Sequence, residues 1–281
     1  MFAQVAIQRS ISRAWALLLG VLALAMPPSA QAQGDLLVAP TRIILTGGGS
    51  AEVVLNNIGA TPATYRIGLE LRRMTPDGDL EIVEDAAATP QEKEMLAAVR
   101  HSPRRILLPP NQPQSVRISA RVPETLPDGE YRVHMTFRAI PEAQSVESGG
   151  EAPSATGLTI RLTPIYGVSI PVIVRKGQLP GGAEVLGASL VRDGGQTALK
   201  VDLARTGARS VYGEIRVIAP GAKQPAYLVR GIAIYPEVQQ RALQLTLNPA
   251  QAAALRGPMT VEYREMPEAG GKLIASRAVT F

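Results

Sequence analysis

Residues Gly157 to Arg175 read GLTIRLTPIYGVSIPVIVR, and this stretch decides how the rest of the chain is interpreted. Large apolar side chains alternate with polar or small ones, which places them on one face of a β-strand. At about 3.3 Å per residue the stretch would extend roughly 60 Å, far beyond an ordinary strand. Because Pro164 and Pro171 cannot donate ladder hydrogen bonds, at least part of it should lie at a sheet edge. The pattern predicts a long apolar edge strand whose free backbone groups invite another chain to pair.

The first residues have the pattern of a secretory signal peptide. Arg9 and Arg13 precede an apolar core from Ala14 to Met26, and Ala30-Gln31-Ala32 is an A-x-A cleavage site. The core is shorter than the ~20 residues that a transmembrane helix needs, although an uncleaved anchor is the alternative. We therefore expect residues 1–32 to be removed and the mature chain to be exported without a membrane span.

The composition of the mature chain narrows the classes of function. Without the two arginines of the signal peptide the formal net charge falls from +5 to +3. A mild, dispersed positive charge with few aromatic side chains gives little support for nucleic-acid binding. Cysteine is absent, which excludes disulfides and thiolate chemistry. The 26 glycines and 23 prolines separate short β-rich runs, a distribution typical of an all-β protein with many turns.

The sequence of the first half, residues 33–175, predicts one β domain with a short helix. Thr89, Pro90 and Glu92 form a capping-box pattern, so a helix is expected over Thr89 to Arg100. Glu130 to Ile140 alternates as a strand with one buried and one exposed face. Its expected core residues are Tyr131, Val133, Met135 and Phe137, and its expected surface residues are Arg132, His134, Thr136 and Arg138.

The second half, residues 176–281, predicts a second β domain after a linker at Lys176-Gly177. Seven short strands with turns every eight to twelve residues are the pattern of an immunoglobulin-like sandwich. The expected strands are Ala183–Val191, Thr197–Ala204, Val211–Ala219, Ala226–Tyr235, Ala242–Leu247, Met259–Arg264 and Lys272–Phe281.

The residues give no support for an enzyme. Nucleophilic catalysis needs a Ser, Thr or Cys beside a base that a third group holds, and neither histidine has such surroundings. No G-x-S-x-G motif occurs, and the acidic residues lie in turns and on exposed strand faces. Asp77-Gly78-Asp79 lacks the further ligands of a calcium loop. We therefore expect no catalytic residue, no metal and no cofactor.

Four stretches of the first half resemble the periplasmic chaperones of the chaperone–usher pathway, which assemble pili. Ala39 to Arg42 resembles the end of the family's first strand, and Val54 to Leu69 its second and third strands. Ser102 to Ile118 is similar to the segment S-P-x-x-x-L-x-P-x-x-x-Q-x-x-R. Leu126 to Pro141 is similar to the signature L-P-x-D-R-E-S…I-P, with one residue fewer before Glu130.

This resemblance implies two immunoglobulin-like sandwiches in a boomerang arrangement, with a subunit-binding cleft between them. In the family the chaperone lends a long edge strand to a pilus subunit that lacks one, a mode of pairing known as strand addition. The lent strand would be about residues 157–175. Its subunit-binding side chains would be Leu158, Ile160, Leu162, Tyr166, Val168, Ile170 and Val172. Expected partners are pilus or fibre subunits and an outer-membrane usher, and the free edge could also allow self-association.

The resemblance also implies roles for charged residues. Arg42 matches the family's cleft arginine, which anchors the subunit's terminal carboxylate. The family's cleft lysine has no match, because Ser169 or Pro171 stands in its place, and Lys176 or Arg161 could substitute only in a different geometry. Glu130 and Arg175 match an ionic link between the domains.

A second interpretation is an exported immunoglobulin-like module that binds cell surfaces or carbohydrate. In such a module the long strand would be shared between domains and no subunit would be captured. An exposed aromatic platform would favour this function, but the one tryptophan, Trp15, lies in the signal peptide.

Overall fold

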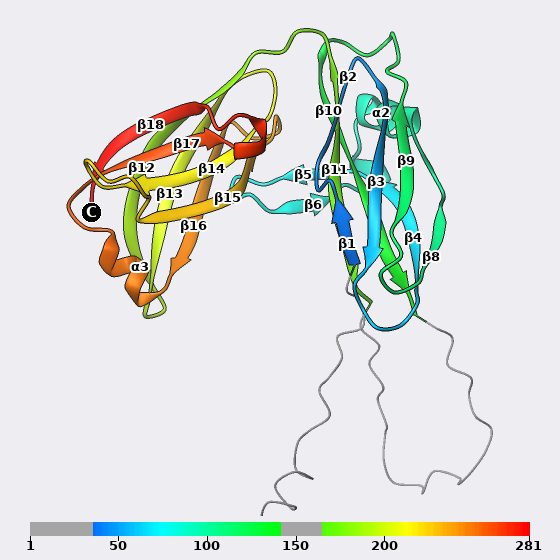
Figure 1. Ribbon diagram of the computed structural model, residues 1–281. Helices are drawn as coiled ribbons and strands as arrows, with labels where there is room; N and C mark the ends of the chain where they lie inside the picture. Colours follow the sequence, from blue (N-terminus) through cyan, green and yellow to red (C-terminus); the bar gives the residue numbers. More distant parts are fainter. Residues whose placement is uncertain (1–35, 142–164) are drawn as a thin grey trace, which may run out of the picture. The chain divides into compact units, whose positions relative to one another are not determined.

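The structure is a computed structural model that describes residues 36–141 and 165–281. It is all-β, with two immunoglobulin-like sandwiches, as the sequence predicted (Figure 1). Several predictions concern residues outside the described ranges. These are the expected signal peptide, the segment 142–156 and, in the expected edge strand, Leu158, Ile160, Leu162 and Pro164. Within the described residues, no helix is long and apolar enough to cross a membrane.

The first sandwich packs a four-stranded sheet against a five-stranded sheet, with strand orders β1-β3-β9-β7 and β2-β11-β10-β4-β8. Its core is aliphatic, with the buried rings of Tyr65 and Phe137. The strands are β1 (Leu36–Ala39), β2 (Ile43–Thr46), β3 (Gly49–Asn57), β4 (Ala63–Glu70), β7 (Val99–Ser102), β8 (Arg105–Leu108), β9 (Gln114–Ala120), β10 (Gly129–Ile140) and β11 (Gly167–Lys176).

The second sandwich consists of sheets with the orders β12-β13-β16 and β15-β14-β17-β18. Each of the seven strands predicted in this half coincides with an observed strand. They are β12 (Gly181–Asp193), β13 (Gln196–Gly207), β14 (Val211–Ile218), β15 (Tyr227–Ile234), β16 (Gln240–Leu247), β17 (Pro258–Glu265) and β18 (Leu273–Thr280). The short helix α3 (Pro249–Ala254) and the 3₁₀ turn η2 (Pro267–Ala269) lie between strands.

The predicted helix is α2 (Pro90–Ala98), preceded by the 3₁₀ turn η1 (Asp85–Ala87). Both bonds of the predicted capping box are present, because the Thr89 side chain accepts from the Glu92 backbone and the Glu92 side chain accepts from the Thr89 backbone. Met95, on the apolar side of the helix, is buried in the core of the first sandwich. The local sequence is therefore sufficient to start this helix and to orient it.

The chain changes sheets near Pro40, where the sequence predicted an interruption. β1 pairs antiparallel with β3 in one sheet, and β2 pairs parallel with β11 in the other. The switch between sheets brings Arg42 to the start of β2, at the edge of the five-stranded sheet.

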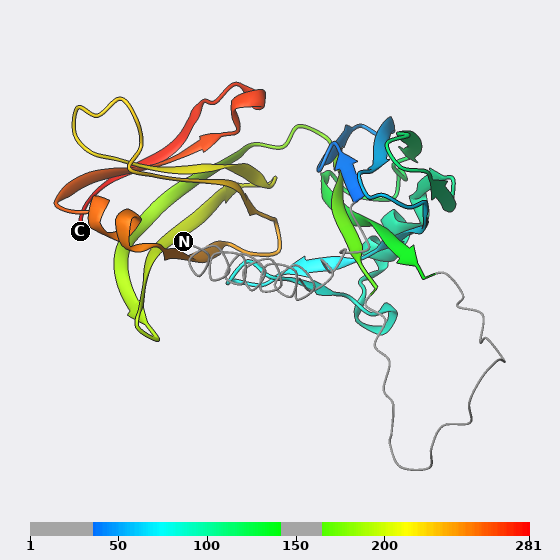
Figure 2. The ribbon, with the colours of Figure 1, turned by 60° about the horizontal axis from the view of Figure 1, so that its bottom comes forward.

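A hairpin of β5 (Arg72–Met74) and β6 (Leu80–Ile82) extends away from the sheets of the first sandwich (Figure 2). Its residue Met74 is buried in the hydrophobic core cluster of the second sandwich. At the hairpin tip, the Pro76 carbonyl accepts a hydrogen bond from the Ala242 backbone N–H at 3.0 Å. The hairpin therefore joins the two sandwiches through both apolar and polar contacts.

Candidate functional site

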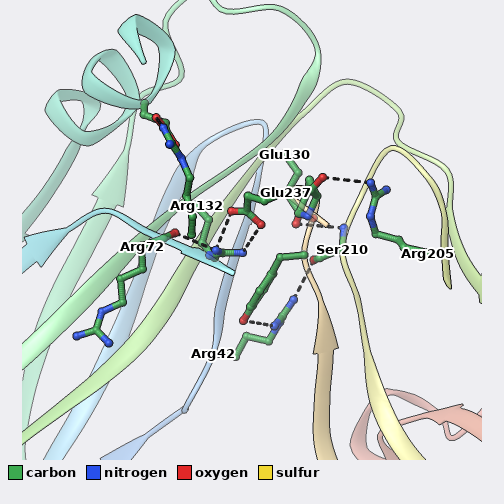
Figure 3. Close-up of polar contacts among 11 residues, drawn as sticks. Arg42, Arg72, Glu130, Arg132, Arg205, Ser210 and Glu237 are labelled. Carbon is green, nitrogen blue, oxygen red and sulfur yellow. Dashed lines mark hydrogen bonds and ion pairs between the residues drawn. The ribbon is translucent and has the colours of Figure 1, made fainter. Parts of the chain in front are cut away.

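Polar and aromatic side chains gather where the first sandwich meets the second (Figure 3). We call this group the junction cluster, and its members are Arg42, Glu130, Arg132, Arg175, Arg205, Ser210, Tyr212, Tyr235 and Glu237. At its centre the side chain of Glu130, on β10, is fully buried. One carboxylate oxygen accepts from Arg175 Nε, on β11, at 2.8 Å, and the other accepts from the Ser210 backbone N–H at 3.1 Å. Glu130 thus bonds to both sandwiches, and its contact in the second is a backbone donor rather than a charged side chain.

Arg42 lies beside Glu130 in the junction cluster. Its Nη1 donates to the Tyr235 hydroxyl at 3.1 Å and its Nη2 to the Ser210 hydroxyl at 3.0 Å. The guanidinium also lies 4.7 Å from the ring centroid of Tyr212 and 5.4 Å from that of Tyr235, within cation–π range. Among residues 36–141 and 165–281, no carboxylate lies within ion-pair distance of Arg42. A guanidinium has five N–H donors, so Arg42 keeps donors for an anion that is not part of this chain.

Arg132 is a buried cation of the junction cluster, with 3% of its side chain exposed. Its Nη2 lies 2.7 Å from a carboxylate oxygen of Glu237 and donates to the Arg72 carbonyl at 2.9 Å. Its guanidinium stacks on Tyr235 at 3.6 Å from the ring centroid. Burial of this charge is possible because a carboxylate, a carbonyl and an aromatic face all compensate it.

Arg205 holds the loop that carries Tyr235 and Glu237. The buried guanidinium donates to the Pro236 carbonyl at 3.2 Å and to the Val238 carbonyl at 3.4 Å, from either side of Glu237. These bonds fix the loop against β13. They therefore fix the aromatic face and the carboxylate that Arg132 contacts.

The prediction that Arg132, His134 and Thr136 lie on an exposed face is wrong, because all three are buried. Alternation separated them correctly from the core residues of β10. However, at Arg132 this face is covered by Tyr235 and Glu237, which come from a distant segment of the chain. Period two identifies the two faces of a strand but not what covers the second one.

His134 is 1% exposed, and both ring nitrogens lack a hydrogen-bond partner among the described residues. Burial, together with the positive charges of Arg132, Arg72 and Arg42, lowers the pKa of the imidazole from its ordinary 6.5 to about 3. The ring is therefore neutral at neutral pH. A buried polar ring without hydrogen bonds lowers the stability of a fold and is uncommon in native structures.

This neutral ring predicts a pH dependence of stability. Below pH 6.5 the unfolded chain protonates His134 while the folded chain does not, so stability falls as the pH falls towards about 3. Between pH 6.5 and 5 the loss from this group is about 2 kcal/mol. His134→Leu should remove it, and urea denaturation of both proteins at the two pH values measures the difference. Equal losses in the two proteins would show that the ring protonates in the folded state.

The outer edge of β11 is the second part of the candidate site. Within the described residues β10 covers one side of β11 throughout, whereas β2 covers the other only from Val172 to Arg175. The Tyr166 carbonyl accepts from Ala139 of β10, and the Arg175 carbonyl accepts from Gly47 on the opposite side. Backbone groups alternate in direction along an antiparallel strand. The N–H and C=O groups of Gly167 and Ser169 therefore point outward, to a side with no strand in the described part of the chain.

This alternation explains why β11 tolerates a proline. Pro171 is at a position whose backbone nitrogen points away from β10, so its missing N–H interrupts no bond of that ladder. The same reasoning corrects the expectation of one long edge strand. β11 is an edge from Gly167 to Pro171 and an internal strand from Val172 onward.

The assignment of Ile170 and Val172 to a subunit-binding surface is wrong. Both are buried in the core of the first sandwich, Ile170 with 2% and Val172 with 0% of its surface exposed. Ile170 and Val172 alternate in the same phase as Tyr166 and Val168, so all four side chains lie on one face of β11. At Ile170 and Val172, however, this face packs into the core of the first sandwich. Tyr166 is exposed (46%), and Val168 is half-buried. The apolar surface available to a partner therefore begins at Val168 and continues towards lower residue numbers.

No protein-family model and no curated protein matches the sequence. Among solved structures, the YadV chaperone is 13% identical, with 88% of this chain and 100% of that chain covered and a TM-score of 0.48. A chain of the CsuC–CsuE chaperone–tip adhesion subunit pre-assembly complex, from the archaic chaperone–usher Csu pili of Acinetobacter baumannii, is 11% identical, with 88% and 97% covered and a TM-score of 0.45. The chain is similar to these chaperone structures.

A third similar structure is the Salmonella enterica SafA pilin in complex with the SafB chaperone. It is 14% identical, with 90% of this chain and 99% of the matched chain covered and a TM-score of 0.44.

Lys176 does not supply the cation that the sequence lacks at Ser169 and Pro171. Its ammonium donates to the carbonyls of Pro123, Glu124 and Leu126, in the first sandwich. Arg161 lies outside the described residues. In the described ranges no group of three or more potential metal-ligating side chains occurs.

Sequence reasoning missed several members of the junction cluster. Ser210, Tyr212, Tyr235 and Glu237 come from the second sandwich, where the resemblance to the chaperone family has no matching motif. They meet Arg42 and Arg132 only after both sandwiches have formed. The one local signal is the segment Tyr235-Pro236-Glu237, a buried aromatic and a carboxylate on a loop directly after β15.

Proposed function

We propose that this chain is a periplasmic chaperone that captures pilus or surface-fibre subunits and delivers them to an outer-membrane usher. In this proposal residues 1–32 direct export, and the edge that begins at β11 and continues to residue 157 is lent to an incomplete subunit. Tyr166 and Val168, with Leu158, Ile160 and Leu162, supply the apolar side chains that fill the subunit's groove. The observation that carries the proposal is the outer edge of β11 from Gly167 to Pro171, which no strand pairs with among residues 36–141 and 165–281.

An unpaired edge is a hazard that soluble proteins normally block with charges, bulges or covering loops. Here the outward groups of Gly167 and Ser169 are flanked by Ile165 and Tyr166, which are 62% and 46% exposed. An additional strand would gain backbone hydrogen bonds along the edge and apolar contacts from alternate side chains. Capture of a strand therefore uses both features, and an isolated binding module has no need of them.

The start of β2 limits how far an added strand can extend. β2 pairs with β11 from Val172 onward, so a strand that joins the free edge must stop or turn away near Pro171. By the register of β2 and β11, Arg42 lies beside Pro171 at this point. The guanidinium has only neutral partners among the described residues, which suits a terminal carboxylate better than a terminal ammonium. We therefore assign Arg42 as the anchor for the carboxylate of the captured strand.

Replacement of Tyr166 by aspartate should reduce capture of a subunit at least about tenfold, because a charge would enter the apolar contact. The test is co-expression of the mature chain with a candidate fibre subunit, followed by measurement of the one-to-one complex after purification. Since Tyr166 is exposed, the variant should unfold at the same temperature as the parent protein.

Leu107→Asp is the matched control. Leu107 is 56% exposed and lies on β8, the opposite edge strand of the same sheet. It should leave capture unchanged. Equal capture by the parent and the Tyr166→Asp protein, or equal loss in both variants, would contradict the use of the β11 edge.

A further inference from the structure

Three arginines lie side by side on the outer face of the five-stranded sheet, and we call them the arginine row. Arg138 on β10 pairs in register with Arg66 on β4, and Arg66 pairs with Arg105 on β8. All three are exposed, because the neighbouring residues Tyr65 and Phe137 face the core on the other side of the sheet. Like charges directly opposite each other in a sheet lower its stability. The arginine row therefore needs an explanation outside the fold of the sheet.

The described residues compensate the arginine row only in part. Arg138 donates to Glu70 at 2.6 Å, but the side chains of Arg66 and Arg105 have no hydrogen bond or ion pair among residues 36–141 and 165–281. A charge on an edge strand discourages pairing with another sheet, which would account for Arg105 on β8. It does not account for Arg66 and Arg138, because β4 and β10 are internal strands. A negatively charged ligand outside this chain would account for all three.

A second row, two residues along each strand from the first, is mostly apolar. Ile140 on β10 pairs with Thr64 on β4, and Thr64 pairs with Leu107 on β8. A backbone hydrogen bond between β10 and the residue before β11 continues their register and places Ile165 beside Ile140. Leu107 and Ile165 are 56% and 62% exposed. We call Ile165, Ile140 and Leu107 the apolar row.

Both rows lie at the end of the first sandwich that is away from the junction cluster. β10 is 12 residues long, so Ile140 at its end lies about 34 Å from Glu130 at its start. Ile165 also lies on the face opposite to Tyr166 and Val168, because side chains alternate along a strand. Contacts made by the two rows therefore do not use the side chains that we assign to the groove of a subunit.

We propose that the arginine row and the apolar row bind the surface of an anionic phospholipid bilayer. Such a surface presents phosphate groups directly above the glycerol and acyl region, so it offers negative charge beside apolar contact. Guanidinium groups bind phosphate oxygens through paired N–H donors. Aliphatic side chains next to them can enter the region below the headgroups. Two adjacent rows, one basic and one apolar, match this order of groups.

The size of the surface favours a lipid over a protein partner. The two rows span four strands of the sheet, and at the usual spacing of residues and strands they cover about 250 Å². A stable protein interface needs about 800 Å² on each partner. Binding to a charged bilayer instead accumulates residue by residue, with a gain of about fivefold in partition for each arginine near the surface. Three arginines therefore give about a hundredfold preference for an anionic bilayer at low ionic strength.

Sedimentation of the mature chain with phospholipid vesicles tests this proposal. One set of vesicles contains phosphatidylglycerol and phosphatidylcholine in roughly equal amounts, and the other contains only phosphatidylcholine. In dilute buffer the chain should partition about a hundredfold more strongly to the anionic vesicles. This preference should fall at least about tenfold when the salt concentration is raised to about 1 M, because charges are then screened beyond about 3 Å.

The double variant Arg66→Gln with Arg105→Gln should bind the anionic vesicles about twentyfold more weakly than the parent protein. The matched control is Arg117→Gln with Arg256→Gln, which removes the same charge from exposed positions outside the rows and should bind within about twofold of the parent. Leu107→Ser should weaken binding about fivefold, because less apolar surface leaves water. All five positions are exposed, so each variant should unfold at the same urea concentration as the parent.

Equal partition of the parent protein into both sets of vesicles overturns the proposal, and so does an equal loss in the two double variants. If the vesicles are not bound but Arg66→Gln with Arg105→Gln weakens capture of a fibre subunit, the two rows bind an acidic protein surface and the lipid assignment fails. Capture that depends on Tyr166 is measured without vesicles, so these outcomes are separate from the test of the proposed function.

Discussion

Replacement of Glu130 by alanine is expected to lower the free energy of unfolding by about 3–5 kcal/mol, the usual cost of removing one partner of a buried ion pair. The Arg175 guanidinium would lose its carboxylate while only 16% of its side chain is exposed. The Ser210 backbone N–H, which donates to the same carboxylate, would become unsatisfied as well. Both losses occur at the point where the two sandwiches meet, so the cost falls on their association and on the fold of each.

Urea denaturation of the purified mature chain measures this loss. Glu52→Ala is the matched control, because Glu52 also pairs with an arginine, Arg117, but the two side chains are 55% and 73% exposed. Exposed pairs contribute about 0–1 kcal/mol. Glu130→Gln should lie between the two, since an amide oxygen can still accept from Ser210. A loss for Glu130→Ala as small as that for Glu52→Ala would mean that Arg175 and Ser210 find other partners.

The regular elements could be predicted from the sequence where local patterns determine them. The second sandwich is the clearest case, because its strands are short, alternate and are separated by glycine or proline turns. The helix after Thr89 is another, since both bonds of its capping box lie within four residues. In β10 the alternation identified the core residues Val133, Met135 and Phe137 correctly.

The site could be predicted only in part, because its residues depend on which segments meet. Arg42 and Glu130 followed from motifs of the first half, whereas no pattern near His134 indicates that arginines from three segments surround it. The alternation through Ile170 and Val172 is the same as that through Tyr166. Whether such a side chain faces its own core or a partner depends on where the sandwich ends, and a strand pattern carries no information about that limit.

The β5–β6 hairpin shows the same dependence on distant contacts, and it determines how firmly the candidate site is held. Met74, at the end of β5, is 6% exposed among the core residues of the second sandwich. Gly78, at the tip, has a φ of +96°, and a Cβ there would lie 2.2 Å from Arg241 Nε. The positive φ favours glycine at this position, and a side chain there would displace the Arg241 guanidinium. Arg241 in turn donates to the Ala233 carbonyl, two residues before Tyr235.

Met74→Ala should therefore lower the free energy of unfolding by about 2–5 kcal/mol and loosen the contact between the sandwiches. Met95→Ala is the control, since Met95 is 1% exposed and belongs to the core of the first sandwich. The two variants lose the same side chain and should have similar costs. They should differ in hydrogen exchange at the Ala242 amide, which donates to Pro76 in the hairpin. Exchange there should accelerate strongly in Met74→Ala and little in Met95→Ala at matched stability, because only Met74 holds the hairpin on the second sandwich. Equal acceleration in both would mean that the amide opens only when the whole chain unfolds, and that the hairpin has no separate role in holding the junction.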